Sequence, residues 1–238
     1  LQDSFPGSTV GRLEGSVFTT LEVSDLKLAG AGGKPFVTVG YAKVDVGIVP
    51  LVTKHVRVDR LVLDDVYVDP DAQPPAKPSV GPSSPPSWSI ELWSLAVHRA
   101  HIVLPDNDVT GLDVAGSVFL PAGGTLTAIV AAKGVWRGQS FEADAYARKG
   151  KVLEVPLAHV AVAGGSADVL GARIGDVPTG EAIAQLSPAL AKLLVPDRDI
   201  PSVIAVAHAR GGGGIAFEVE GGGLSVRAGA SVTRVALS

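Results

Sequence analysis

Histidines and clustered acidic residues are the side chains of this sequence whose types could bind a metal ion. Of the five histidines, only His98 and His101 are close together. A spacing of three brings two histidines together on a helix, but this stretch alternates like a strand, on which they face apart unless a bulge intervenes. No carboxylate or cysteine supplies the third ligand that a zinc site needs. We therefore predict no metal site at this pair.

Two acidic clusters could provide oxygen ligands or a carboxylate pair. Asp106, Asn107 and Asp108, with Asp113 beyond, lack the twelve-residue calcium loop with its central glycine and final glutamate, so a polar turn explains them. The second cluster needs no paired-carboxylate chemistry, because polar doublets recur throughout this part of the chain. Its members are Asp64, Asp65, Asp69 and Asp71.

The motifs of common enzyme and nucleic-acid sites are missing from the sequence. No serine lies in a G-x-S-x-G elbow, and no glycine run carries the lysine and hydroxyl of a phosphate-binding loop. A net charge of -4 without a basic stripe argues against binding to nucleic acid. The absence of cysteine excludes disulfides and thiolate metal sites. We expect a protein that is not an enzyme and that uses no cofactor.

The segment from His55 to Val68, HVRVDRLVLDDVYV, has the most regular pattern in the chain. Its apolar residues form three pairs, with a spacing of two inside a pair and three between pairs: Val56 and Val58, Leu61 and Leu63, Val66 and Val68. A spacing of two indicates a strand, whereas a step of three moves the next pair to the other face. Either both faces are partly apolar, or a β-bulge at each polar doublet restores the face.

We favour bulges, because the same rhythm occurs in three other segments. These are Leu21–Leu28, Val37–Ile48 and Ile90–Leu104. The composition agrees with such strands: apolar residues make up 46% of the chain but aromatic residues only 5%, so the apolar surfaces are aliphatic. No stretch reaches the roughly 18 apolar residues needed to span a bilayer. The first residue is leucine, so we expect a piece of a longer chain.

The chain divides into three regions by composition. We expect an N-terminal meander of antiparallel strands over residues 1–69 and a linker or long loop with polyproline II character over residues 70–87, which holds seven prolines. Residues 88–238 continue as strands, although Pro156 argues against a central strand at its position. The segment Thr179–Val195 is the one predicted helix, with Thr179 as N-cap and a kink at Pro188.

The predicted fold is therefore all-β. A closed sandwich with its aliphatic side chains in the core is one arrangement. The other, which we favour, is a long, twisted, mostly antiparallel sheet curled into a U-shaped trough, with one amphipathic helix near residues 179–195. An open trough would expose a large apolar surface, which soluble proteins rarely do without a ligand. Acyl chains suit such a surface, because they need aliphatic walls and no placed polar groups.

The N-terminal pattern resembles a known family. Gly7-Ser8-Thr9-Val10-Gly11, followed by the paired strands up to Val68, resembles the start of the periplasmic region of the AsmA-like/TamB family. The resemblance extends weakly to Trp88–Leu104, and the proline segment and the helix depart from it. It implies a U-shaped sheet that carries phospholipid between the inner and outer membranes. It also implies a periplasmic location in a Gram-negative bacterium, an inner-membrane anchor outside this segment and a TamA-like outer-membrane partner. The family brings no catalytic residues.

The resulting prediction is a segment of a lipid-transfer bridge in the cell envelope, with phospholipid as its ligand. The rival is a structural or adhesive β-domain whose aliphatic side chains form a closed core without a lipid. The predicted lining of the groove consists of Val23, Leu28, Val39, Val46, Val56, Val58, Leu61, Leu63, Val66 and Val68.

Overall fold

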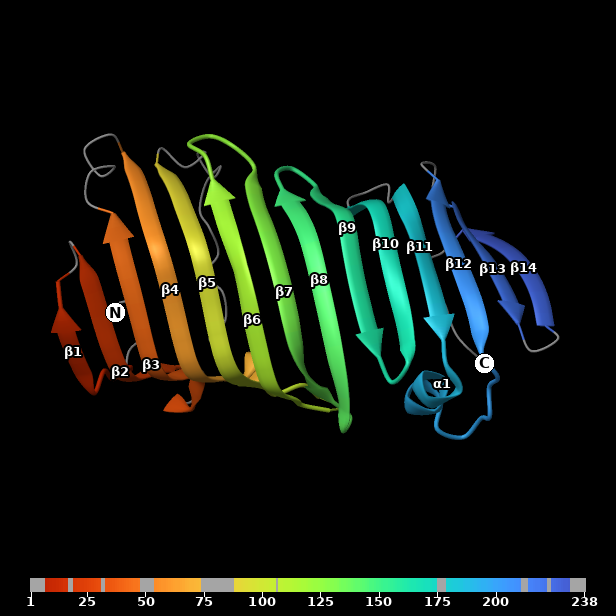
Figure 1. Cartoon of the computed structure of the whole chain (residues 1–238), viewed down its shortest axis with the longest axis horizontal. Coiled ribbons are helices and arrows are strands. Elements are labelled where there is room, and N and C mark those ends of the chain that lie inside the picture. Colours follow the sequence, from red (N-terminus) through yellow and green to blue (C-terminus); the bar gives the residue numbers. More distant parts are fainter. Residues whose placement is uncertain are drawn as a thin grey trace. The chain divides into compact units, whose positions relative to one another are not determined.

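The computed structural model describes residues 7–16, 19–30, 33–47, 54–73, 88–105, 107–174, 179–210, 214–221 and 224–231. The chain forms two compact units, Leu1–Gly138 (unit 1) and Gln139–Ser238 (unit 2). Both units consist mostly of β-strands whose order in the sheet follows their order in the chain (Figure 1). Among the described strands no pairing joins the first strand of a unit to its last, so each sheet is open.

The strands of unit 1 lie side by side. They are β1 (Arg12–Gly15), β2 (Thr20–Ala29), β3 (Pro35–Gly47), β4 (His55–Val68), β5 (Ser89–Ile102), β6 (Val109–Leu120) and β7 (Leu126–Trp136). The strands of unit 2 are β8 (Gln139–Lys149), β9 (Leu153–Val162), β10 (Gly165–Ile174), β11 (Thr179–Leu186), β12 (Val203–Arg210), β13 (Gly214–Gly221) and β14 (Leu224–Ser231). The predicted mostly antiparallel β-fold is confirmed, as is the meander formed by β2, β3 and β4.

One strand pair of unit 1 is parallel. β4 pairs with β5 at a constant offset of 34 residues, from His55 opposite Ser89 to Val68 opposite Ile102. The two strands repeat one apolar rhythm, so the offset places the apolar pairs of β5 beside those of β4. Strands from both sides of the proline-rich segment therefore pair with each other. The domain boundaries predicted at residues 69/70 and 87/88 stay a prediction.

Backbone irregularities, which we call bulges, lie at the polar doublets between the apolar pairs. The register shifts at Asp59 (β4 against β3) and at Arg99 (β5 against β6), whereas at Asp25 and Asp65 a residue with positive φ kinks the strand without shifting its register with β3. Asp25, Asp65 and Arg99 have φ values of 53°, 54° and 54°, a left-handed conformation that side chains other than glycine rarely adopt. Gly111 on β6 has the same conformation, with a φ of 56°. One such residue thus lies in each of β2, β4, β5 and β6. The extra residue lets the apolar pairs on both sides of a doublet return to the same face.

The predicted helix over Thr179–Val195 is wrong in its first half. Thr179–Leu186 is strand β11, which pairs with β10 on one side and β12 on the other. Gly180, with a φ of 133°, does not fit a helix, and the ladder bonds to two neighbours outweigh the helical spacing of Ile183 and Leu186. The helix α1 spans only Pro188–Leu194 and is the one α-helix among the described residues.

Ser187, and not Thr179, is the N-cap of this helix. Its Oγ accepts a hydrogen bond from the Leu190 backbone N–H at 3.0 Å. Pro188 occupies the first turn, where its missing N–H costs nothing, and so it starts the helix instead of kinking it. Pro188 begins the helix because strand β11 ends at Leu186, before the proline is reached.

Pro156 lies inside β9, at an irregularity of the sheet. The register with β8 shifts between Tyr146 and Arg148, and neither β8 nor β10 has a residue paired with Pro156. A position without a ladder bond tolerates a residue that has no N–H. The strand predicted over residues 152–162 is therefore confirmed despite its proline.

The proline-rich segment is described only at its start. There Pro70–Ala72 forms a 3₁₀ turn, η3, capped by the Asp69 side chain, in place of the extended connector that the sequence predicts. Residues 74–87 lie outside the described residues, as do the strand predicted over residues 232–237, Asp106 and most of the connection over residues 49–54.

Candidate functional site: the aliphatic face of unit 1

The register of unit 1 places the apolar pairs of successive strands next to one another. Residues that are partners across two strands project to the same face of a sheet. Val23 is opposite Ala42, which is opposite Leu63, and Leu63 lies beside Val97 of β5. A parallel row on the other side of the bulges joins Leu26, Val39 and Val66.

All ten residues that the sequence predicts for the groove lie on this face of β2, β3 and β4. Their role as a lining for lipid stays a prediction. We call the surface the aliphatic face and define it by these residues and the partners that continue their rows. The partners include Leu21, Leu26, Val37, Ala42, Val44, Ile90, Leu92, Leu95, Val97, Ala100, Ile102, Leu112, Val114, Val118 and Val130.

Burial is shallow over the aliphatic face. No large side chain of the described residues is fully buried. Four of the five buried positions on the aliphatic face form one row across four strands, just beyond the bulges: Val39 (6% exposed), Val66 (8%), Ala100 (3%) and Leu112 (8%); the fifth, Ala42 (7%), lies in the row with Val23 and Leu63. At the end of the sheet Ile90 is 42% exposed. Among the described elements, contacts of the unit 1 strands are with their sheet neighbours and η3, so no described element forms a second layer over this face.

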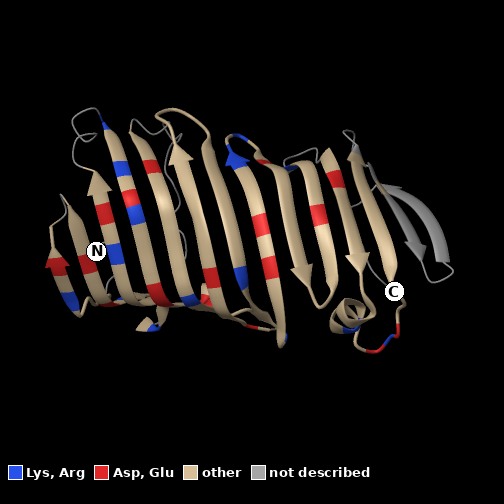
Figure 2. Cartoon of the chain, viewed as in Figure 1, with Lys and Arg blue, Asp and Glu red and all other residues tan. Residues whose placement is uncertain are grey.

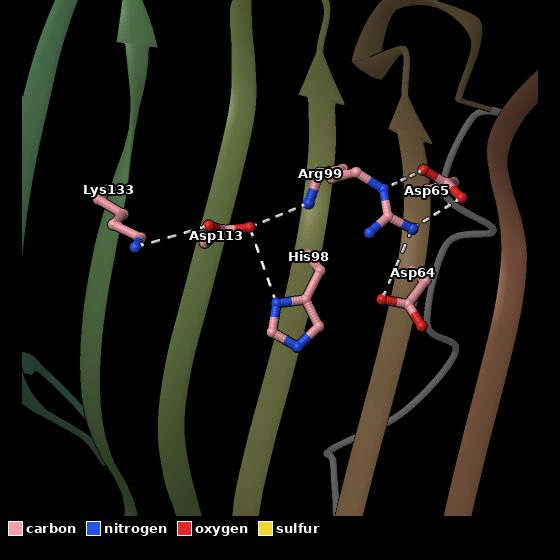
Figure 3. A network of polar contacts seen from close by, with 6 residues as sticks. All are labelled: Asp64, Asp65, His98, Arg99, Asp113 and Lys133. Carbon is pink, nitrogen blue, oxygen red and sulfur yellow. Dashed lines mark hydrogen bonds and ion pairs between the residues drawn. The ribbon is translucent and has the colours of Figure 1, made fainter.

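A polar network on the opposite side holds the bulges of β4 and β5 together (Figure 3). Arg99 donates from Nε to Asp65 Oδ1 at 2.7 Å and from Nη2 to Asp65 Oδ2 at 3.0 Å. Its Nη2 is also 3.9 Å from Asp64 Oδ1. The side chains of the consecutive residues Asp64 and Asp65 therefore both contact the guanidinium group of Arg99. In a regular strand they would point to opposite faces, so this contact indicates a bulge. Figure 2 shows charged positions interrupting the uncharged stretches of these strands.

The network continues across β6 to β7. Asp113 Oδ1 accepts a hydrogen bond from the Arg99 backbone N–H at 3.1 Å and lies 3.7 Å from His98 Nδ1. Lys133 Nζ on β7 lies 3.9 Å from the other oxygen of Asp113. Bidentate pairing is the strongest form of such a contact, so Asp65 and Arg99 form its centre. The network faces away from the aliphatic face and keeps charge off it.

Hydrogen bonds shift the pKa values of Asp65, Arg99 and Asp108. The hydrogen bonds from Arg99 hold the pKa of Asp65 below its usual value, and the same pair raises the pKa of Arg99. His101 and the Leu104 backbone N–H lower the pKa of Asp108. All three groups are ion-paired. These shifts accompany structural pairing.

The side chains that the sequence analysis considered as metal ligands contact different partners in the structure. His101 Nε2 lies 2.7 Å from Asp108 Oδ2, whereas His98 faces Asp113. Asp69 caps η3 by accepting from two backbone N–H groups. Within the described part of the chain, no group of three or more His, Cys, Asp and Glu side chains is placed to hold a metal ion.

Unit 2 has a face of a different kind. The register across β8–β12 places small residues side by side, which we call the alanine face. Its ten central positions include eight alanines: Ala143, Ala145, Ala158, Val160, Ala167, Val169, Ala182, Ala184, Ala205 and Ala207. The larger apolar side chains Leu157, Leu170 and Ile183 lie on the other face of this sheet and are exposed.

Comparisons with known proteins identify no relative. No family model, no curated protein and no solved structure matches this chain. Within the described residues, no helix is both long and apolar enough to cross a membrane.

The sequence interpretation missed the pairing of Asp65 with Arg99. A signal for it existed, because β4 and β5 carry the same rhythm, and matching their doublets at the offset of 34 brings Asp64 and Asp65 beside His98 and Arg99. It also missed the extension of the aliphatic face over β6, where Gly116 takes an apolar position. There the Cβ of any larger residue would lie 2.4 Å from the Ile129 carbonyl oxygen.

Proposed function

We propose that unit 1 forms part of a trough that shields the acyl chains of phospholipids, as in the AsmA-like/TamB proteins that its N-terminal pattern resembles. The aliphatic face of β2–β7 is the surface that holds the chains. In this proposal the chain acts in the periplasm of a Gram-negative bacterium, tethered to the inner membrane, and passes lipid towards the outer membrane with a TamA-like partner. Binding and transfer involve no chemical reaction.

One observation carries the proposal: a wide face of valine and leucine is left without a second layer of described residues. A closed core of this width would contain several large side chains with no exposure, and the described residues include none. An aliphatic surface without placed polar groups fits flexible hydrocarbon and offers nothing to orient a polar ligand. The open sheet in unit 1 supports the trough shape.

The bulges support the same function. In β4 the bulges keep the valine and leucine pairs on one face along all fourteen residues of the strand. Without the bulge at Asp65, the pair Val66 and Val68 would turn to the polar side. The Asp65–Arg99 pair holds that arrangement from the far side, so no charge has to lie on the aliphatic face.

The decisive experiment is to measure phospholipid that co-purifies with the chain, by native mass spectrometry and lipid extraction. Two neighbouring residues of β4 provide a matched pair of variants, because Leu61 lies on the aliphatic face and Val62 on the other. Leu61→Glu should lower bound phospholipid by about tenfold or more, since a charge facing hydrocarbon is costly. Val62→Glu should leave the bound amount unchanged.

Urea denaturation of both variants separates lost binding from lost folding. If the aliphatic side chains instead form the closed core of a structural or adhesive domain, the wild-type chain will carry no phospholipid. In that case Leu61→Glu will unfold unit 1. Equal lipid loss in the two variants would also contradict the proposal.

A further inference from the structure

A cavity of about 510 Å³ lies at one end of the unit 1 sheet, on the side opposite the aliphatic face. Its walls come from the first residues of β4 and β5 and from the end of the β6–β7 hairpin. His55, Glu91 and Phe119 point to the same side because His55 is the partner of Ser89, and Glu91 is the partner of Phe119. Leu120 and Pro121 also line the cavity, and Leu120 is the partner of Ile90 at the end of the aliphatic face.

One wall is a linked set of polar side chains. His55 Nδ1 and Ser89 Oγ are 2.5 Å apart, and His55 Nε2 lies 3.4 Å from Glu91 Oε2. The same Glu91 oxygen accepts a hydrogen bond from the Trp93 indole N–H at 2.9 Å. Because these contacts fix the carboxylate, Glu91 is oriented before any ligand arrives. Its second oxygen has no hydrogen-bond partner among the described residues.

Hydroxyl groups line the cavity two strands away from Glu91, where Thr127 is the partner of Phe119 and Phe119 is the partner of Glu91. Thr125 and Thr127 line the cavity, and within the described part of the chain neither hydroxyl has a hydrogen-bond partner. A hydroxyl both donates and accepts, so two of them in one cavity with a carboxylate oxygen suit a ligand that itself carries several hydroxyls. The wall includes no lysine or arginine. The one lining group that can become a cation, His55, already contacts Ser89 and Glu91, so the cavity favours a neutral ligand over an anionic one.

An apolar surface completes the cavity. Phe119 lines it, and the Trp93 ring stands edge-on to Phe119, with ring centroids 5.9 Å apart. The C–H face of a sugar ring is apolar whereas its edge carries hydroxyls, which matches one aromatic wall and two polar walls. We propose that this cavity binds a single neutral sugar ring, held by Thr125, Thr127 and Glu91 with its C–H face against Phe119.

The proposal is tested by titrating the isotope-labelled chain with D-glucose, D-galactose and N-acetyl-D-glucosamine and following its amide and indole resonances. At least one sugar should shift the Trp93 indole signal and the Phe119 and Thr127 amides saturably, with a Kd on the order of 1 mM. Thr127→Val should weaken this binding about tenfold. Thr38→Val is the matched control, because Thr38 lies on the same side of β3 and outside the cavity.

Glu91→Gln separates a neutral ligand from a cationic one. A sugar should still bind this variant within about threefold, since the amide oxygen replaces the carboxylate as acceptor. Saturable shifts with ethanolamine that disappear in Glu91→Gln, without shifts from any sugar, would overturn the proposal. So would the absence of saturable shifts with all three sugars, or wild-type affinity in Thr127→Val. Unchanged amide positions away from the cavity show that a variant is folded.

Discussion

The two units of this chain use the same strand order but distribute their apolar side chains differently. Unit 1 places valine and leucine on one face and its charged network on the other. Unit 2 covers one face with alanine, and its larger aliphatic residues share the other face with the ion pairs His159–Asp168 and Glu181–His208. Apolar surface area, and with it the capacity to hold hydrocarbon, is therefore concentrated in unit 1.

The difference also concerns what supports each sheet. In unit 1 a side-chain network ties neighbouring strands together at their bulges. In unit 2 the helix α1 packs at the end of the β9–β10 hairpin, where Ser187 Oγ donates to the Ala163 carbonyl oxygen at 2.6 Å. A face lined by alanine has little side-chain volume of its own. A packed helix is thus the main source of burial there, with Leu190 and Ala191 buried.

The largest expected effect is a charge placed in the most buried row of the aliphatic face. Val66→Glu should destabilise unit 1 by about 3 kcal/mol, because the row leaves no water for an unpaired carboxylate. Ala184→Glu on the alanine face should cost unit 2 only about 1 kcal/mol, because Ala184 is partly exposed. All three tryptophans, Trp88, Trp93 and Trp136, lie in unit 1, so their fluorescence during urea denaturation measures the loss in that unit, and hydrogen exchange of the β10 and β11 amides measures the loss in unit 2.

Equal losses in the two variants would remove the distinction between the faces. The charge-neutral change Val66→Ala serves as a control for lost packing. It should cost about 1 to 2 kcal/mol, so the remaining loss in Val66→Glu comes from the buried charge.

An intermediate effect is expected for the contact between α1 and the sheet of unit 2. Leu190 is 7% exposed, and its Cδ2 lies 2.6 Å from where a Cβ on Gly165 would be. Leu190→Ala should cost about 2 kcal/mol, at the low end for leucine because the site is near the edge of a thin structure. Leu194→Ala, on the exposed side of the same helix, should cost less than about 0.5 kcal/mol.

Hydrogen exchange of the β9 and β10 amides measures this loss in unit 2. Exchange in β2–β5 should not change, because those strands belong to unit 1. Faster exchange in both units would mean that α1 supports more than the sheet of unit 2.

The smallest expected effect is the acid sensitivity of the Asp65–Arg99 pair. Because Arg99 lowers the pKa of Asp65, the carboxylate contributes stability above the ordinary aspartate value of about 3.9 and loses it as the pH falls through the lower folded value. Asp65→Asn should therefore reduce the stability of unit 1 at pH 7 and flatten its decline below pH about 4. Both side chains are exposed, so the effect is screened by salt.

Tryptophan fluorescence during acid titration, at low and high salt, measures this contribution. Parallel titration curves for the wild type and Asp65→Asn would show that the pair adds nothing to the stability of the sheet.

Much of unit 1 follows from its sequence. The segment His55–Val68 is strand β4 with the predicted limits, and bulges lie at predicted polar doublets in β2, β4 and β5. In β3 the predicted doublet is wrong, because Ala42 lies in the apolar row with Val23 and Leu63. The limits of β4 and these bulges were readable because an aliphatic rhythm with a period of two is a local pattern. Asp and Gly, which tolerate a positive φ, often supply the extra residue, as at Asp25, Asp65 and Gly111. Arg99 could not be recognised in this way, because arginine has no such preference.

The sequence by itself determined the strand rhythm, the aliphatic composition of one face and the positions of the bulges, since each depends on residues near one another in the chain. Only the tertiary structure decided that β4 and β5 run parallel and that Thr179–Leu186 is a strand. It also decided that Pro188 begins a helix. The physical reason is that ladder hydrogen bonds join residues far apart in sequence. Two neighbouring strands can therefore override the local helical spacing of a short segment.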